Sequence, residues 1–318
     1  MHPVAGQFDI CKRLVVHHWH CDFFGESVFA HVQRFALVGR HHANWRTGIS
    51  RRLAVFVGGG SKKLKAITLP KSATTIHDVI EQLDEIIDNA VQQNSRLGFF
   101  AVLYRTVTVK VKEGIAAGRF ENGERMERLD VIFANRYLEA YEQFRSGATP
   151  TSSWLKAFES AKSWRPLILQ HLLLGINAHI NLDLGIAAAM TAPGSALPGL
   201  KRDFVEINKI LGELLDTVQQ KIGSLSSLLG LLDKVGGRTD ETVFEFSMEM
   251  ARDGAWRFAE KFAALTPEQH PAAIADRDEK IVKLARRIIN PGWLLRLAAL
   301  VIRLFESGNV FKIIRTLS

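Results

Sequence analysis

The sequence predicts an all-α protein, built as a multi-helix antiparallel bundle. Three observations lead to this prediction. Apolar residues recur at helical spacing along the chain from residue 69 onward, and several of these periodic segments end at a glycine. In addition, no Asn-Gly pair joins two alternating runs, as it would in a β-hairpin. With 318 residues, the chain is long enough to bury a sizeable core.

The first helix is predicted to begin at Thr74 or Thr75, because a threonine side chain caps a helix start well, and to end near Ser95. A second helix is predicted from about Phe99 to Ala117, before Gly118. Residues 103–111 are rich in β-branched side chains and alternate, so a strand is the alternative there. The helical neighbours favour the helix.

The middle of the chain continues in the same way. A third helix is predicted from about 123 to 144, a short fourth helix from Pro150 to about 161, and a long fifth helix over about 165–191, stopped by Pro193-Gly194. Thr239 and Thr266-Pro267 are further start signals. The later helices are expected at about 200–222, 225–235, 240–264, 276–290 and 292–306.

The first 63 residues differ from the rest in composition. They hold nine Lys/Arg against three Asp/Glu, which is +6 of the total net charge of +8, and they hold both cysteines, Cys11 and Cys21. They show no sustained helical or strand period. We therefore predict that residues 1–63 are an N-terminal extension, poorly structured or foreign to the natural protein, and that residues 68–318 form the helical domain.

The composition also limits the class of function. Beyond residue 63 the chain holds 32 basic and 30 acidic residues, and no basic stripe with interleaved aromatic residues, so no nucleic-acid binding is expected. The main body has no cysteine, no signal peptide is evident, and no run of 18 apolar residues is free of polar interruption. These features predict a soluble, cytoplasmic protein with no transmembrane segment.

The C-terminal segment 293–305 is an apolar helix with Arg296 and Arg303 seven residues apart. One interpretation is weak peripheral contact with a membrane surface. The interpretation that we favour is a helix packed on the bundle, with both arginine head groups reaching water.

The predicted helix from Gln170 to Ala189 is the most informative part of the sequence. His171, His179 and Asp183 drift across one face of this otherwise apolar helix, and Asn177 and Asn181 lie on the other side. Each such buried polar group must find a partner or cost about 1–3 kcal/mol. Gly175, between the two histidines, would leave space for a ligand or a neighbouring helix.

The two preceding long helices add further candidates. Asp130 shares a mostly apolar face with Tyr137, near Asn135, and Arg105 lies on the same side of its helix as Thr108. If these helices pack against the Gln170–Ala189 helix, Asp130 would converge with the polar groups of that helix, and Arg105 could pair with it.

Three chemistries are consistent with this set. In the first, His171, His179 and Asp183 bind a divalent Zn²⁺, Mn²⁺ or Fe²⁺ ion. Asp130 is then a fourth ligand or a base, and Arg105 pairs with a carboxylate or another anion. In the second, the same residues form a structural hydrogen-bond network that fixes the register of the bundle. In the third, no metal is present, and His179 is a general base that Asp183 orients. The further ligand-binding candidates are Tyr137, Asn135, Asn177, Asn181 and Thr108.

Three segments resemble a known family. G-F-F-A-V-L-Y-R-T-V-T (98–108), M-E-R-L-D-V-I-F-A-N-R-Y-L-E-A-Y (126–141) and Q-H-L-L-L-G-I-N-A-H-I-N-L-D-L (170–184) are similar to bacterial and fungal proteins known as domain of unknown function 5995. The resemblance covers about residues 68–306. It implies a helical fold and adds no reaction.

Two functions follow as hypotheses. The first is a metal-dependent enzyme acting on a small or lipid-like molecule, with Asp130, His179 and Arg105 as catalytic residues. The second is a non-enzymatic helical binding or scaffold protein in which the same residues form a structural network.

Overall fold

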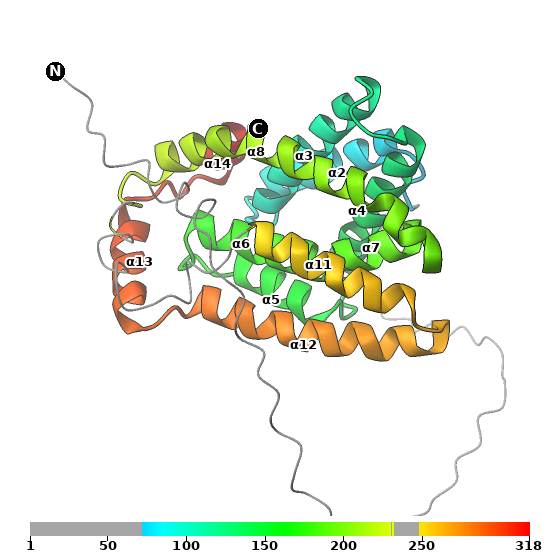
Figure 1. The fold of residues 1–318 in the computed structure, drawn as a ribbon. Coiled ribbons are helices and arrows are strands. Elements are labelled where there is room, and N and C mark those ends of the chain that lie inside the picture. The colour runs from blue at the N-terminus through cyan, green and yellow to red at the C-terminus, as the bar shows by residue number, and fades with distance from the viewer. Residues whose placement is uncertain (1–71, 230, 232–247) are drawn as a thin grey trace, which may run out of the picture. The chain divides into compact units, whose positions relative to one another are not determined.

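The computed structural model describes residues 72–229, 231 and 248–318. In this part of the chain every regular element is a helix, which confirms the all-α prediction (Figure 1). The predicted extension 1–63 lies outside the described residues.

The first three helices begin and end within about three residues of the predicted positions. Helix α2 (Ile76–Gln92) starts at a capping box: Asp78 donates its backbone N–H to the Thr75 hydroxyl at 3.1 Å and accepts the Thr75 N–H at 3.0 Å. Helix α4 (Gly123–Ser146) ends at Gly147, whose φ of 83° is a left-handed conformation that glycine adopts without strain. Helix α3 (Gly98–Ala116) is continuous, so the strand alternative for residues 103–111 is wrong.

The long helix expected over about 165–191 is interrupted in the middle. It consists of α6 (Ile168–Ala178), one π-helical turn (His179–Asp183) and α7 (Leu184–Thr191). The sequence analysis also missed a 3₁₀ segment, Gly194–Leu200, and the last helix, α14 (Val310–Leu317).

The remaining helices follow the prediction with shifted ends. The predicted helix 225–235 and the start of the helix predicted from 240 fall largely outside the described residues, and the helix predicted from 276 begins six residues earlier. The bounds are α5 (Ser152–Ala161), α8 (Lys201–Leu225), α11 (Met248–Ala263), a short 3₁₀ turn (Pro267–Gln269), α12 (His270–Ile289) and α13 (Trp293–Phe305).

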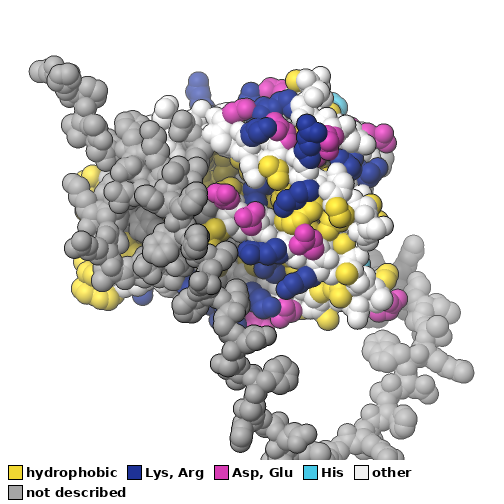
Figure 2. All heavy atoms as spheres, viewed as in Figure 1, with side chains coloured by type: hydrophobic (Ala, Val, Ile, Leu, Met, Phe, Trp, Pro, Cys, Tyr) yellow, Lys and Arg dark blue, Asp and Glu magenta, His cyan; other side chains and the backbone are white. Residues whose placement is uncertain are grey.

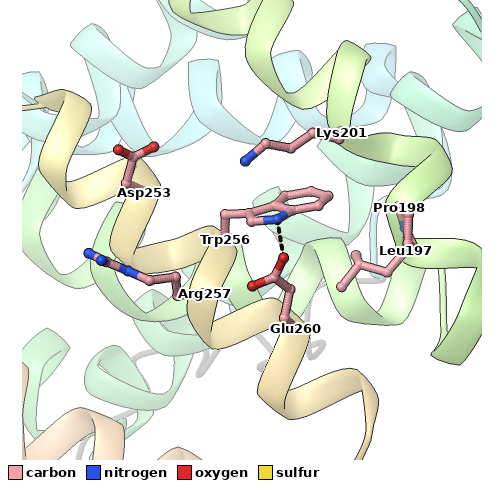
Figure 3. Close-up of a pocket in the computed structure, with 7 residues that line it drawn as sticks. All are labelled: Leu197, Pro198, Lys201, Asp253, Trp256, Arg257 and Glu260. Atoms are coloured by element: carbon pink, nitrogen blue, oxygen red, sulfur yellow. Dashed lines mark hydrogen bonds between the residues drawn. The ribbon is translucent and has the colours of Figure 1, made fainter.

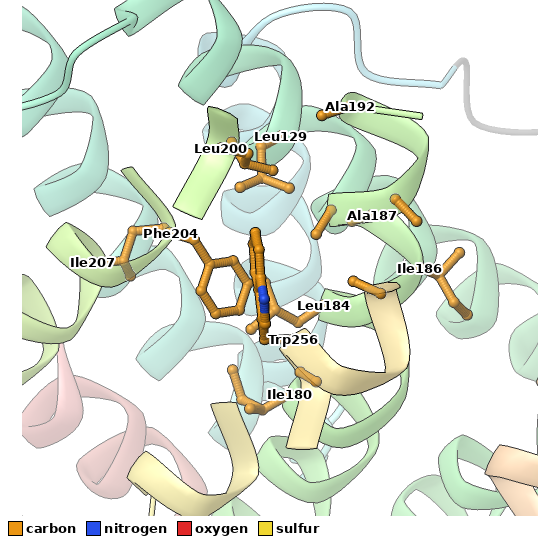
Figure 4. Packing of buried hydrophobic residues seen from close by; sticks show 14 of the residues in the cluster. Leu129, Ile180, Leu184, Ile186, Ala187, Ala192, Leu200, Phe204, Ile207 and Trp256 are labelled. Carbon is orange, nitrogen blue, oxygen red and sulfur yellow. The ribbon is translucent and has the colours of Figure 1, made fainter. Parts of the chain in front are cut away.

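The interrupted helix lies at the centre of the packing. Its first half, α6, contacts α3, α5 and α12, whereas its second half, α7, contacts α4 and α11. Around α7, the largest hydrophobic cluster places Trp256 of α11 edge-on to Phe204 of α8, beside Leu184 and Leu129 (Figure 4). Gly175 of α6 permits the contact with α3, because a Cβ atom there would lie 2.5 Å from Cγ of Phe100.

This central position accounts for the apolar composition of the interrupted helix. Residues Ile168–Thr191 are long and apolar enough to cross a membrane, but 83% of the most apolar window is buried inside the bundle. Helices α12 and α13 pass the same test only when they are joined across a bend of 62°.

Candidate functional site

His179 and Asp183 meet in the π turn at the centre of the bundle. The imidazole Nδ1 lies 3.3 Å from the Asp183 carboxylate, and both side chains are almost fully buried. Single π turns within α-helices occur frequently at functional sites. The sequence placed His179 and Asp183 on one helix face, and the structure brings them into direct contact, but the sequence gave no sign of the π geometry.

Two further residues complete the bonding of Asp183. Arg136 of α4 donates its Nε–H to Oδ1 at 3.0 Å, and Trp154 of α5 donates its indole N–H to Oδ2 at 2.8 Å. We call His179, Asp183, Arg136 and Trp154 the Asp183 network. The network connects α4, α5 and the π turn. The Asp183 carboxylate accepts hydrogen bonds from the other three residues.

The sequence analysis missed Arg136 and Trp154. Arg136 gave a weak signal, since it is a cation within the mostly apolar stretch 129–138 of its helix. Trp154 gave none, because its contact with Asp183 depends on how α5 packs in three dimensions.

Aromatic rings surround the imidazole of His179. The Phe133 ring stacks on it with the centroids 3.5 Å apart and the planes 8° from parallel, and Tyr104 meets it edge-on at 4.5 Å. Three more rings lie at centroid distances of 5.7 to 6.2 Å: Phe100, Trp154 and Tyr137. Nothing the size of a substrate fits between these rings and the imidazole.

Burial and the neighbouring groups set the charge states of this pair. Burial lowers the pKa of His179 despite the neighbouring Asp183 carboxylate, so the imidazole is neutral at pH 7. For Asp183, burial raises the pKa, but Arg136 and the hydrogen bonds from His179 and Trp154 outweigh burial and lower it. His179 therefore donates through Nδ1, and its Nε2 atom has no hydrogen-bond partner.

Asp130 lies apart from this network, on a small cavity of about 40 Å³ that Tyr104 and Arg252 also line. One oxygen of Asp130 and Nε of Arg252 are buried without partners. Burial, followed by the charge of Glu127, raises the pKa of Asp130 to about 7. A cavity of this size has room for water but not for an organic substrate.

Two of the expected neighbours are elsewhere. His171 contacts Ser160 through Nδ1 at 3.1 Å and does not join His179; burial, together with Arg96 and Arg303, lowers its pKa to about 3. Arg105 pairs with Asp84 of α2 rather than with Asp130. The sequence placed these side chains on suitable helix faces but could not show which neighbouring helix each face meets.

In consequence, the expected four-residue cluster does not form, and only His179 and Asp183 come together. Within residues 72–229, 231 and 248–318, no three His, Cys, Asp or Glu side chains are grouped so that they could hold a metal ion.

The other candidates, except Tyr137, form hydrogen bonds within the protein. Asn177 donates to the Ile281 carbonyl of α12 at 3.2 Å and accepts from Asn181 at 3.0 Å. Asn135 exchanges two 2.9 Å hydrogen bonds with the backbone of Ala73, and the Thr108 hydroxyl donates to a carbonyl of its own helix. Tyr137 is buried and its hydroxyl has no partner.

The comparisons with known proteins identify the family. A family model described as a family of unknown function (DUF5995) matches residues 76–291. The chain belongs to this family. Neither the curated proteins nor the solved structures contain a match. The DUF5995 match spans α2 to α12, so it includes the Asp183 network and the Asp130 cavity and leaves out α13 and α14.

The DUF5995 domain also has an open surface groove of about 580 Å³ between α11, the start of α8 and the 3₁₀ segment (Figure 3). Trp256 forms its floor and donates its indole N–H to Glu260 at 2.7 Å. Lys201 lies over the Trp256 ring, with Nζ 4.3 Å from the centroid. Asp253 and Arg257 complete the rim, so both signs of charge face the groove.

Proposed function

We propose that this chain is a non-enzymatic helical binding or scaffold protein, and that the Asp183 network is structural. The observation that supports this proposal is the closed bonding of Asp183, whose carboxylate accepts from Arg136, Trp154 and His179. A buried network of this kind fixes helix register. The one atom that it leaves unpaired, Nε2 of His179, belongs to a ring enclosed by Phe133 and Tyr104.

The groove at Trp256 is the place for a ligand under this proposal. Its volume of about 580 Å³ is in the range of small-molecule sites. Its apolar floor and its mixed rim, with Lys201 and Arg257 against Asp253 and Glu260, suit a small ligand that carries both charges.

The experiment compares the full chain with its His179→Ala variant in two measurements, metal content by elemental mass spectrometry and thermal unfolding. The metal content is measured after incubation with Zn²⁺, Mn²⁺ or Fe²⁺ and removal of excess ion. We expect the variant to melt several degrees lower, because it loses a buried ring and leaves Asp183 with one donor fewer, and to hold the same metal content as the parent. Ser160→Ala is the matched control for the other buried histidine, since it removes the partner of His171 and leaves the network intact.

Stoichiometric metal in the parent that is absent from His179→Ala would overturn the structural proposal and favour a metal-dependent enzyme. An unchanged melting temperature in His179→Ala would equally contradict a structural role.

A second candidate function, a metal-free enzyme with His179 as general base, is favoured by one observation. The Nε2 atom of His179 has no partner while Nδ1 is held by Asp183, which is the arrangement of an oriented base. The access of a reagent to His179 distinguishes the structural proposal from the metal-free enzyme. Under the structural proposal, diethyl pyrocarbonate modifies the exposed His77 readily and His179 only on unfolding, as read by peptide mass mapping. Rapid modification of His179 in the folded protein would favour the enzyme.

A further inference from the structure

Helix α13 is apolar on both of its faces. Leu295, Ala298 and Ile302 point inward and are buried. Trp293 and Leu304, on the opposite face, are 73% and 68% exposed. A helix that is apolar all round is normally enclosed by protein or by lipid. Among the residues that the structure describes, none gives the outward face of α13 the cover that its composition calls for.

The exposed apolar residues form a continuous row rather than scattered positions. At about 100° per residue, Trp293, Leu297, Leu300 and Leu304 lie within about 60° of one another around the helix. Single exposed apolar side chains are ordinary on a protein surface, whereas a continuous row marks an interaction site. The row, which we call the α13 face, consists of Trp293, Leu294, Leu297, Leu300, Val301, Leu304 and Phe305, and Phe311 at the start of α14 continues it in sequence. Apolar side chains gather at the lower left of Figure 2, where Figure 1 places α13.

The exposed charged side chains of α13 and of its flanking sequence have one sign. Between residues 286 and 318, the exposed charged side chains are all cations: Arg286, Arg287, Arg296, Lys312 and Arg315. The only acidic residue of this segment, Glu306, is buried, where it accepts hydrogen bonds from Ser226 and from the backbone of Ile168. These cations favour an anionic partner for this surface. A second copy of the same surface is disfavoured, because it would bring five cations against five.

The sequence-based expectation that the head group of Arg303 reaches water is wrong. Its guanidinium does not reach water but donates to the Trp164 carbonyl and to Glu306. Arg303 thus holds the inward face of α13 to the bundle. The outward face is almost purely apolar, with Arg296 at its edge.

We propose that the α13 face docks on an anionic lipid bilayer, with α13 lying in the plane of the membrane. An outward row of leucines with few hydrogen-bonding groups suits hydrocarbon, a terminal tryptophan suits the headgroup region, and flanking cations suit anionic lipid. This inference is independent of the proposed function, since α13 contributes no residue to the Asp183 network or to the groove at Trp256.

The experiment is vesicle flotation of the full chain, with phosphatidylcholine vesicles alone and with vesicles containing about one third phosphatidylserine. We expect binding to the anionic vesicles, weakened by salt, and at least a ten-fold weaker partition in the double variant Leu297→Ser/Leu304→Ser. Arg296→Gln should weaken binding about five-fold, the usual contribution of one cation near an anionic surface. The matched control is Met190→Ser, which removes a 55% exposed apolar side chain at the end of α7.

Three results would overturn the proposal. One is that the double variant still binds anionic vesicles, because the binding would then belong to another part of the chain. Another is no vesicle binding by the parent. The third is a parent dimer, seen by analytical ultracentrifugation, that the double variant converts to a monomer without any lipid binding by the parent. All three substitutions in α13 are at exposed positions, and unchanged thermal unfolding establishes that each variant is folded.

Discussion

Removal of the Asp183 carboxylate tests how the bundle depends on its buried network. In Asp183→Ala, Arg136 loses its partner and the indole N–H of Trp154 loses its acceptor. Breaking a buried ion pair costs about 3–5 kcal/mol, and the lower end applies because the Arg136 side chain is 23% exposed. A buried donor left unbonded adds about 1–3 kcal/mol.

The combined loss of about 4 kcal/mol corresponds to a fall of roughly 8–16 °C in melting temperature for a domain of this size. Calorimetry or thermal circular dichroism measures it. The matched control is Asp84→Ala, which removes the acid from another Arg–Asp pair whose side chains are 38% and 46% exposed, and which should cost within about 1 kcal/mol.

The contribution of Asp183 to the free energy of unfolding changes with pH in one direction. The pKa of Asp183 is lowered in the folded protein, so its contribution is present above the ordinary carboxyl range and is lost as the pH falls through the lowered pKa. The difference in stability between the parent and Asp183→Ala should therefore shrink in acid. Equal losses in Asp183→Ala and Asp84→Ala at neutral pH would refute the reasoning.

Three further substitutions test other parts of the structure. Asp130→Asn should raise the free energy of unfolding at pH 8. The pKa of Asp130 is raised from 3.8 to about 7 in the folded protein, so the folded state loses stability as the pH rises from 3.8 to 7, by about 4 kcal/mol at most. Urea unfolding at pH 4 and at pH 8 should show the gain at pH 8 only. Gly175→Ala should lower the melting temperature markedly, because its Cβ would overlap the Phe100 ring, and a variant that melts like the parent would disprove that close contact. Thr75→Ala should cost about 1 kcal/mol in chemical unfolding by removing the cap of α2, and no loss would show that Asp78 alone secures that helix start.

Local signals in the sequence carried most of the helical prediction. Thr75 and Gly147 act through neighbouring backbone groups, so the helix ends that they mark could be read without knowledge of the fold. The missed helix α14 had a comparable signal: Asn309 caps it, and Ile313 and Ile314 lie on its buried face. Its short length made the period easy to overlook.

The candidate site was only partly predictable, because local signals reveal contacts within one helix but not contacts between helices. His179 and Asp183 are four residues apart on one helix, so their contact is local. The partners of Arg105 and Trp154 are 21 and 29 residues away in sequence and are chosen by helix packing. A single sequence shows which faces are polar, but it does not show which faces meet.

The π turn gives the central helix an exact length requirement. Residues 179–183 set the rotation between α6, which is fitted to α3, α5 and α12, and α7, which is fitted to α4 and α11. Deleting one residue there would turn α7 by about 100° against α6. Variation in this family should therefore accept exchanges between apolar side chains along 168–191 far more readily than any insertion or deletion, so a one-residue gap at this place in a relative would signal a differently assembled bundle.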